Sequence, residues 1–253
     1  MRNLLTTLLC LALSLNVLAQ RRSETGKEAV EDTKIFAYGA TTNTNSGLLG
    51  GFVLRHSNVI NVKEGKTIHR YAALELVNIR HPKENNISRF GNRVSLGKKN
   101  YLFAIRPEYG REWFMFKKNN DEGVGLSTIL AAGPTIGIEK PYYIRYQNPN
   151  EDRPQTVPYN PDIHTNQGSI LGAGNIWQGF LKGAKVVPGV HVKSALNLDM
   201  NTFGDNITGF EFGFTFDYFL RAPEILASEI VENKPFYASG YVTLYFGNKR
   251  IKK

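Results

Sequence analysis

The sequence predicts an all-β protein, an eight-stranded antiparallel up-and-down transmembrane β-barrel. Residues 208–220 read TGFEFGFTFDYFL, and every second residue from Phe210 to Tyr218 is aromatic. Successive side chains leave a strand on opposite faces, so this period of two predicts a strand with one aromatic face. Most of the strand-like segments run to roughly 10–16 residues, a length that suits tilted strands crossing a hydrocarbon layer. Short and long connections largely alternate between them, as in outer-membrane barrels.

The N-terminus predicts a cleaved signal peptide over residues 1–20. Arg2 precedes an apolar run over residues 4–18, and cleavage is expected after Ala19 or Gln20. The single cysteine, Cys10, leaves with this segment, so we expect the mature chain to have no disulfide, thiol nucleophile or cysteine-ligated metal. No later run of about 18 apolar residues predicts a membrane-spanning helix.

The rest of the exported chain is divided into three parts. We expect a periplasmic N-terminal segment at residues 21–33, the barrel at residues 34–247 and a basic periplasmic tail at residues 248–253. The formal net charge of +9 falls to +8 when Arg2 leaves with the signal peptide, and it favours membrane phosphates as partners over nucleic acid, because no zinc-finger, RNP or helix-turn-helix pattern is present.

The first four predicted strands cover residues 34–40, 48–57, 68–80 and 101–116. Alternation is weak in the first and mixed in the third. It is clear in the fourth, where Tyr101, Phe103 and Ile105 oppose the charged residues Arg106 and Glu108.

The last four predicted strands cover residues 124–138, 185–198, 208–220 and 236–246. In residues 185–198 valine and leucine dominate the even positions, while lysine, histidine and asparagine occupy odd positions. In the last strand Phe236, Val242 and Leu244 oppose Ser239 and Thr243. These patterns give each strand one apolar and one polar face.

The apolar faces are expected to point toward lipid and the polar faces toward the lumen. The polar faces carry Gly, Ala, Ser, Thr and isolated charges with few lysines, unlike a sheet face in water. The aromatic stripe of residues 208–220 therefore faces lipid, and Glu211 and Asp217 face the lumen. Two connections fit the alternation poorly: the first outer loop, TTNTNSG, is short, and the following turn, HSNVINVKEGKT, is long.

Three segments carry a resemblance to a known group of proteins. They are FAIRPEYGREW, STILAAGPTIGIEKPYY and the terminal VTLYFGNKR. Between about Ile68 and Arg250 the chain resembles small outer-membrane β-barrels of Bacteroidota. The resemblance implies a barrel in the outer membrane of a Gram-negative cell. It implies no catalytic residue, because the function of that family is not established.

Charged residues on the polar faces form the first candidate site. One interpretation is an active or transport site, and the other is a charge-paired plug, since side chains just fill an eight-stranded barrel and buried charges need partners. The plug is favoured. The expected lumen network contains Arg55, Glu75, Arg106, Glu108, Glu112, His191, Lys193, Glu211 and Asp217.

The second outer loop is the second candidate site. It holds six basic residues and a single acid, Glu84, and we expect these cations to meet lipopolysaccharide phosphates unless the loop is simply solvated. The six residues are Arg80, Lys83, Arg89, Arg93, Lys98 and Lys99.

Two loop histidines leave an enzymatic alternative open. His81 lies near Glu84 and Ser88, and His164 lies near Asp162 and Ser169, but no spacing singles out a triad. The glycines of residues 168–179 lack the G-x-G-x-x-G spacing of a dinucleotide site. We therefore expect no catalytic residue, no metal and no cofactor.

The sequence thus predicts a non-enzymatic outer-membrane barrel, a structural or accessory subunit of an envelope assembly. The loop at residues 139–184 would be its contact surface for an envelope protein complex, with Trp177 and Phe180 on the barrel rim or membrane. The alternatives are a lipid-modifying outer-membrane enzyme and a ligand-binding or narrow-channel barrel.

Overall fold

A computed structural model describes most of the chain that follows the expected signal peptide. The described residues are 32–63, 66–89, 92–116, 124–148, 151, 153–180, 183–203, 206–227 and 231–252. The expected signal peptide at residues 1–20, and residues 21–31 of the expected periplasmic segment, lie outside them. Residues 31–253 form one compact unit. Within the described ranges no helix is both long and apolar enough to cross a membrane.

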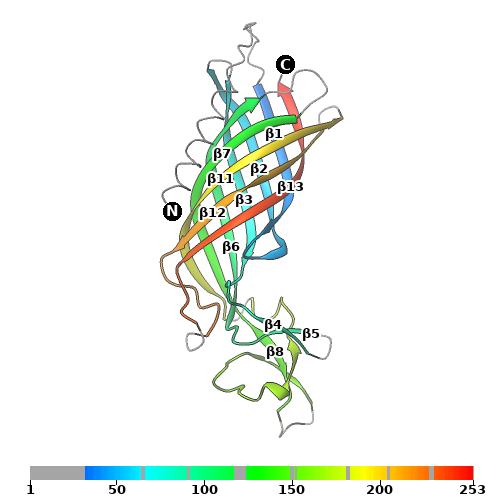
Figure 1. Ribbon diagram of the computed structural model, residues 1–253, viewed down its shortest axis with the longest axis vertical. Coiled ribbons are helices and arrows are strands. Elements are labelled where there is room, and N and C mark those ends of the chain that lie inside the picture. The colour runs from blue at the N-terminus through cyan, green and yellow to red at the C-terminus, as the bar shows by residue number, and fades with distance from the viewer. Residues whose placement is uncertain are drawn as a thin grey trace, which may run out of the picture. The chain divides into compact units, whose positions relative to one another are not determined.

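Eight antiparallel strands close into a barrel, which confirms the predicted fold class (Figure 1). Neighbours follow the order β1-β13-β12-β11-β7-β6-β3-β2, so each strand pairs with the preceding and following barrel strand and the last pairs with the first. The barrel strands are β1 (Asp32–Asn43), β2 (Gly47–Lys63), β3 (Lys66–Ile79), β6 (Asn100–Phe116), β7 (Val124–Pro141), β11 (Lys185–Phe203), β12 (Asn206–Phe219) and β13 (Phe236–Lys252).

The register around the barrel closes with a fixed offset. A path that starts at Arg250 and steps from partner to partner returns to the same strand at Gly240, ten residues away. This offset requires strands that tilt by about 35–45° to the barrel axis. The path passes through Lys34, Asn58, Arg70, Arg111, Leu130, Ser194 and Phe214.

Several strands extend beyond the predicted boundaries. β2 continues to Lys63 and β3 begins at Lys66, so the turn that looked too long in the sequence is mostly paired strand. The expected tail at residues 248–253 is also strand through Lys252, which pairs with Asp32. Backbone pairing needs no apolar side chains, so strands can continue past the part that hydropathy marks.

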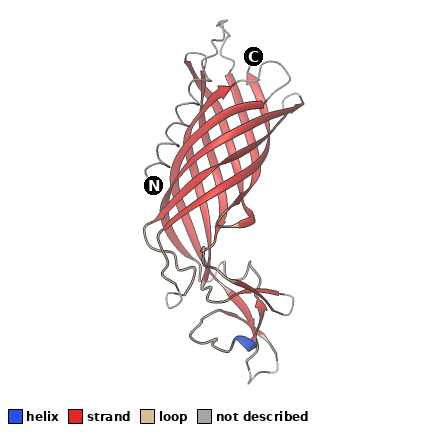
Figure 2. Cartoon of the chain, viewed as in Figure 1, coloured by secondary structure: helices blue, strands red, loops and turns tan. Residues whose placement is uncertain are grey.

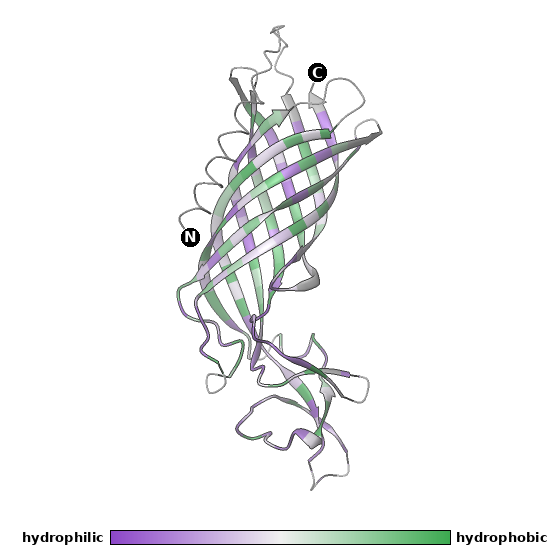
Figure 3. Ribbon diagram, viewed as in Figure 1, coloured by the Kyte–Doolittle hydropathy of each residue, from purple (hydrophilic) through white to green (hydrophobic). Residues whose placement is uncertain are grey.

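The two faces of the barrel wall are arranged as the alternation predicted. Phe210, Phe212, Phe214, Phe216 and Tyr218 point outward and are exposed. The intervening Glu211 and Asp217 are buried inside the barrel. The same alternation of apolar and polar residues continues along the other strands (Figure 3).

Two long loops fold into small sheets that the sequence analysis did not predict (Figure 2). β4 (Asn86–Arg89) and β5 (Asn92–Ser95) form a hairpin, and β8 (Tyr143–Tyr146), β9 (Gln155–Pro158) and β10 (Ile170–Ala173) form a three-stranded sheet. A short 3₁₀ helix, η1 (Gln167–Ser169), precedes β10. A shared core unites both loops and includes Val94, Tyr142, Ile144, Tyr159 and Ile170. We call residues 80–99 and 142–180 together the loop subdomain.

Gly209 on β12 gives a test of the packing inside the barrel. A Cβ atom at this position would lie 2.2 Å from the Tyr245 hydroxyl oxygen and 2.6 Å from the Leu198 carbonyl oxygen. We expect Gly209→Ala to lower the free energy of unfolding by about 1–3 kcal/mol, the usual range for overpacking. Urea unfolding in detergent, followed by tryptophan fluorescence, measures the change.

Gly240→Ala is the matched control. The nearest atoms to a Cβ at Gly240 lie 3.8 Å away, an ordinary contact distance. Its unfolding midpoint should stay close to that of the wild type. Equal midpoints for the two alanine variants would show that the Tyr245 ring is not held over Gly209.

Candidate functional site

The structure brings all nine expected lumen residues together inside the barrel. Each is at most 4% exposed, and each comes from the polar face of its strand. β2, β3, β6, β11 and β12 contribute them, so the network joins strands on different sides of the barrel. We call these nine residues the lumen network.

Arg55 and Lys193 hold one half of the lumen network. The Arg55 guanidinium lies 2.8 Å from Glu112 and 3.3 Å from Glu211. The Lys193 ammonium lies 3.0 Å from Glu108 and 3.2 Å from Glu211. Glu211 therefore bridges the two cations, and three carboxylates surround two positive charges.

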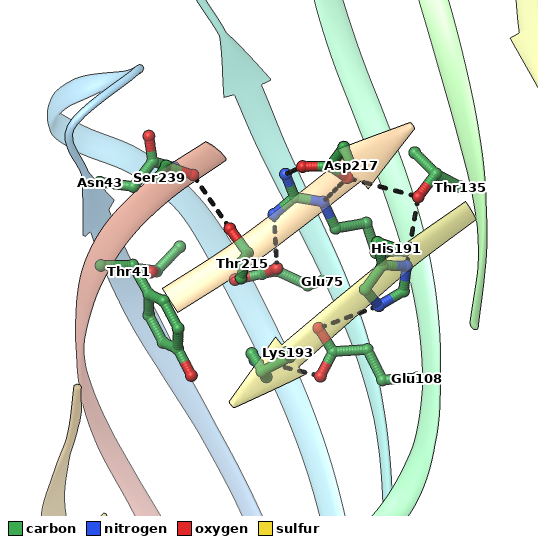
Figure 4. A network of polar contacts seen from close by, with 12 residues as sticks. Thr41, Asn43, Glu75, Glu108, Thr135, His191, Lys193, Thr215, Asp217 and Ser239 are labelled. Atoms are coloured by element: carbon green, nitrogen blue, oxygen red, sulfur yellow. Dashed lines mark hydrogen bonds and ion pairs between the residues drawn. The ribbon is translucent and has the colours of Figure 1, made fainter. Parts of the chain in front are cut away.

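Arg106 holds the other half through Glu75 and Asp217, two of the residues that Figure 4 labels. Its Nε and Nη2 donate to the two oxygens of Asp217 at 2.9 and 2.6 Å, and Nη1 donates to Glu75 at 2.9 Å. Such bidentate geometry gives the strongest kind of charge-assisted hydrogen bond between side chains. The Thr135 hydroxyl lies 3.4 Å from Asp217 and 3.2 Å from His191 Nδ1, so it joins the two halves.

The lumen network contains more acids than permanent cations. Five carboxylates face three permanent positive charges, two acids more than cations. The His191 ring lies beside this group, with Nε2 3.6 Å from Glu108 Oε1.

Neutral hydroxyl groups stabilise these extra carboxylates. Ser57 and Ser127 donate to Glu112 at 2.6 and 2.7 Å, and Tyr241 donates to Glu211 at 2.6 Å. The sequence analysis did not single out these donors. They share the inward parity of the predicted lumen residues, so the alternation carried the signal that could have found them.

Apolar side chains fill the lumen on both sides of the network along the strands. Toward the loop-side strand ends, Ile225 packs with Val77, Leu102, Val187 and Phe219. Toward the opposite ends, the buried side chains are Ile35, Ala37, Ile207 and Tyr245. In the described part of the barrel, the polar centre thus lies between two apolar layers, an arrangement that suits a packed core better than an aqueous path.

The segment that carries Ile225 is fastened to the barrel rim. Arg221 and the Glu224 backbone N–H both donate to the buried Glu139 carboxylate. Its hydrogen bond to Glu139 raises the pKa of Arg221, and the hydrogen bond from Lys99 lowers the pKa of Glu224. The Lys99–Glu224 distance is 2.9 Å. The expected contact loop therefore begins with a residue, Glu139, that serves the barrel itself.

The six expected phosphate-binding cations do not form one surface. Arg80 and Lys83 are exposed, and Lys99 is half-exposed beside Glu224. The side chains of Arg89 and Arg93 lie outside the described part of the structure, although their backbones belong to the β4–β5 hairpin.

Lys98 departs from the expectation because it is buried. Its ammonium donates to both oxygens of Glu84 at 2.8 Å and lies 4.3 Å from the centre of the Tyr101 ring. Burial lowers the pKa of Lys98, and the Glu84 carboxylate opposes that shift. The one acid of this loop therefore pairs with an internal lysine, and Lys98 is withdrawn from the phosphate-binding surface.

The His81 set does not form the hydrogen-bond chain of a catalytic triad in the described residues. His81 Nδ1 accepts the Lys83 backbone N–H at 3.2 Å, and burial together with Lys83 lowers the pKa of this histidine. Both Glu84 oxygens are bound by Lys98, so this carboxylate does not orient the ring. Ser88 is exposed on β4.

The His164 set has a structural arrangement as well. The ring packs against Tyr146 and Tyr159. His164 Nδ1 accepts a hydrogen bond from the Asn160 backbone N–H, with 3.0 Å between the two nitrogens. The Asp162 backbone N–H donates to Asn160 Oδ1, and the Ser169 backbone N–H donates to the Asn166 carbonyl while its own carbonyl accepts from Gln147. None of these hydrogen bonds involves the histidine. No group of three or more His, Cys, Asp or Glu side chains in the described ranges is arranged to hold a metal ion.

Arg106 provides the sharpest test of the lumen network. Arg106→Met should leave the Glu75 and Asp217 carboxylates buried without their cation, which is expected to cost about 3–5 kcal/mol of folding free energy. Urea unfolding in detergent measures this loss, and many molecules should fail to fold. Adding Glu75→Gln and Asp217→Asn should restore much of the stability, since the uncompensated charges are then gone.

Arg145→Met is the control for loss of an arginine, because Arg145 is exposed on β8. Its unfolding midpoint should remain near the wild-type value. An Arg106→Met variant as stable as Arg145→Met would contradict the pairing of charges in the lumen.

Comparison with protein-family models, with curated proteins and with solved structures finds no match to this chain. The resemblance to outer-membrane barrels of Bacteroidota therefore rests on the quoted segments alone.

Proposed function

We propose that this chain is a non-enzymatic outer-membrane β-barrel that acts as a structural or accessory component of the cell envelope. The observation that carries the proposal is the polarity of the closed barrel, which has an apolar outer wall and a charged, filled interior. A barrel that folds in water has the opposite arrangement.

Large exposed apolar side chains occur on all eight strands of the wall. Such a surface far exceeds the apolar patches that soluble monomers tolerate. In a bilayer it is required, because lipid tails surround the wall and closure leaves no strand edge unpaired. Examples are Phe36, Phe52, Leu76, Tyr109, Ile136, Val190, Phe214 and Phe246.

The filled interior favours a structural role over transport. The lumen network places paired charges at the centre, and the apolar layers around Ile225 and Tyr245 occupy the two sides. In the described residues both layers consist mainly of aliphatic and aromatic side chains. The hypothesis of a narrow channel therefore has less support than that of a structural barrel that anchors other envelope components.

The loop subdomain is the part that such a wall would display. It has its own core and lies at the loop ends of the strands, so we propose that residues 139–184 contact an envelope protein complex. Among the described side chains, the exposed Arg80 and Lys83 are the proposed partners for lipopolysaccharide phosphates, whereas Lys98 is internal.

Two tryptophans mark opposite ends of the apolar wall. Trp113 points outward near the end of β6, and Trp177 is 76% exposed in the turn over residues 175–178. This turn reaches the wall through Phe180, whose ring centre lies 5.4 Å from that of Phe103. Both positions fit the boundaries of a hydrocarbon layer, where tryptophan is enriched.

Tryptophan quenching by lipid tests the membrane placement. Trp177→Phe leaves Trp113 as the single tryptophan, and Trp113→Phe leaves Trp177. In vesicles of brominated phosphatidylcholine, Trp113 should lose most of its emission because bromine quenches tryptophans that touch lipid. Heat-modifiable migration on gels confirms folding of both variants.

A water-soluble barrel would give the opposite result. Its Trp113 emission would be quenched by aqueous iodide and unaffected by brominated lipid. That outcome, with a folded protein, would contradict the proposed membrane location.

Charge reversals separate the lipid-facing cations from the internal lysine. Arg80→Glu with Lys83→Glu should reduce co-purified lipopolysaccharide phosphate without loss of folding, because both side chains are exposed. Lys98→Glu places two carboxylates together in a buried position and should open the loop subdomain to protease instead. Phosphate assays and limited proteolysis on purified barrels measure the two effects.

The double exchange Lys98→Glu with Glu84→Lys is the matched control and should restore protease resistance. Unchanged phosphate in the Arg80→Glu and Lys83→Glu variant would mean that these residues are merely solvated.

A further inference from the structure

One outward row of the barrel is unusually rich in positive charge. The row consists of successive register partners, one on each of five neighbouring strands. They are Arg250, Lys34, Asn58, Arg70 and Arg111. The four cations among them are exposed on the outer wall. The row begins beside the ends of β1 and β13, so it lies toward the barrel end opposite the loop subdomain.

Arg70 and Arg111 are the centre of this row, and they face each other directly. They are register partners across β3 and β6. Side chains in such positions are about 4.5–5.5 Å apart at Cβ, and like charges placed there destabilise a sheet. No ion pair joins either arginine to a carboxylate of the described residues.

The outward neighbours offer no negative charge either. Along β3 the adjacent outward residues are Ile68 and Ala72, and along β6 they are Tyr109 and Trp113. Asn58, the partner of Arg70 on β2, adds a neutral amide. Two guanidinium groups, an amide and two aromatic rings thus share one patch of wall, and no carboxylate is among these described outward neighbours.

We propose that Arg70 and Arg111 bind the phosphate of an anionic phospholipid headgroup in the leaflet at this end of the barrel. The inference rests on the proposed membrane location. A phosphate between the arginines removes their mutual repulsion, and guanidinium groups match its geometry with paired hydrogen bonds.

The surroundings favour a lipid over another anion. An arginine on the lipid-facing wall costs about 2–4 kcal/mol at the midplane and little at the interface, so the pair belongs at headgroup depth. Tyr109 and Trp113 are the residue types that concentrate at this depth, and apolar wall continues toward the loops for acyl chains to cover. Lys34 and Arg250 extend the positive field along the same row.

The test compares two double variants of equal charge change. One is Arg70→Gln with Arg111→Gln, and the control is Arg145→Gln with Arg153→Gln, two exposed arginines of the loop subdomain. Phosphatidylglycerol is titrated into each protein in nonionic detergent. Native mass spectrometry counts bound lipid, and urea unfolding measures stability.

We expect phosphatidylglycerol to bind the wild type and the control and to raise their unfolding midpoints. Affinity for the Arg70/Arg111 variant should fall by about tenfold or more, as for loss of hydrogen bonds to a charged group. Without lipid the same variant should be at least as stable as the wild type, because two like charges no longer face each other across the strands. Glycerol phosphate, which lacks acyl chains, should have a much weaker effect.

Equal lipid binding by the wild type and the Arg70/Arg111 variant would overturn the inference. A larger response to polyglutamate than to phosphatidylglycerol would also overturn it and would point to an acidic protein segment. Quenching of Trp113 by brominated lipid separates this failure from failure of the membrane location, since it is independent of both arginines.

Discussion

The need to neutralise charges inside a closed barrel governs much of this molecule. Removing an arginine or lysine from water costs several kcal/mol, so each cation in the lumen must be held by acids in good geometry. Arg55, Arg106 and Lys193 meet this need through carboxylates from β3, β6 and β12. Because partners come from different strands, the network fixes which residues must lie at the same level. Strand register and charge pairing therefore depend on each other.

The same constraint explains the two surfaces of the wall. Once the polar faces are committed to the interior, the apolar faces must point outward, and a bilayer is the solvent that accepts them. The few outward charges then become informative. Arg70 and Arg111 break the apolar pattern in neighbouring positions, whereas the aromatic stripe of β12 does not. Under the proposed membrane location, the two arginines mark the membrane boundary and the aromatic stripe marks the hydrocarbon layer.

Alternation along the sequence was enough to predict the barrel, its eight strands and the nine lumen residues, because parity assigns a face to every position in a strand. Parity could place Ser57 and Tyr241 inside the barrel. It does not say which residues meet across the lumen, so the acids to which they donate and the bridging role of Glu211 could not be predicted. Strand ends were also missed, since residues such as Lys63 and Lys252 pair through the backbone without an apolar face.

The fold of the loop subdomain could not be predicted from the sequence for a different reason. Its strands, β4, β5, β8, β9 and β10, have four residues each, too few to show a period. The pairing of Lys98 with Glu84 spans fourteen residues of loop, and no local pattern signals it. A basic loop therefore looked like one phosphate-binding surface, although one of its lysines holds the subdomain together.

Electrical recording across a planar bilayer tests the account most directly, because its central claim is that the lumen is a packed core. Folded wild-type protein, incorporated at a level verified by labelling, should leave the membrane without stable conductance steps across the physiological range of voltage. Reproducible, ion-selective open levels from the wild type would contradict the claim, since ions could not then be excluded by the lumen network and its apolar layers.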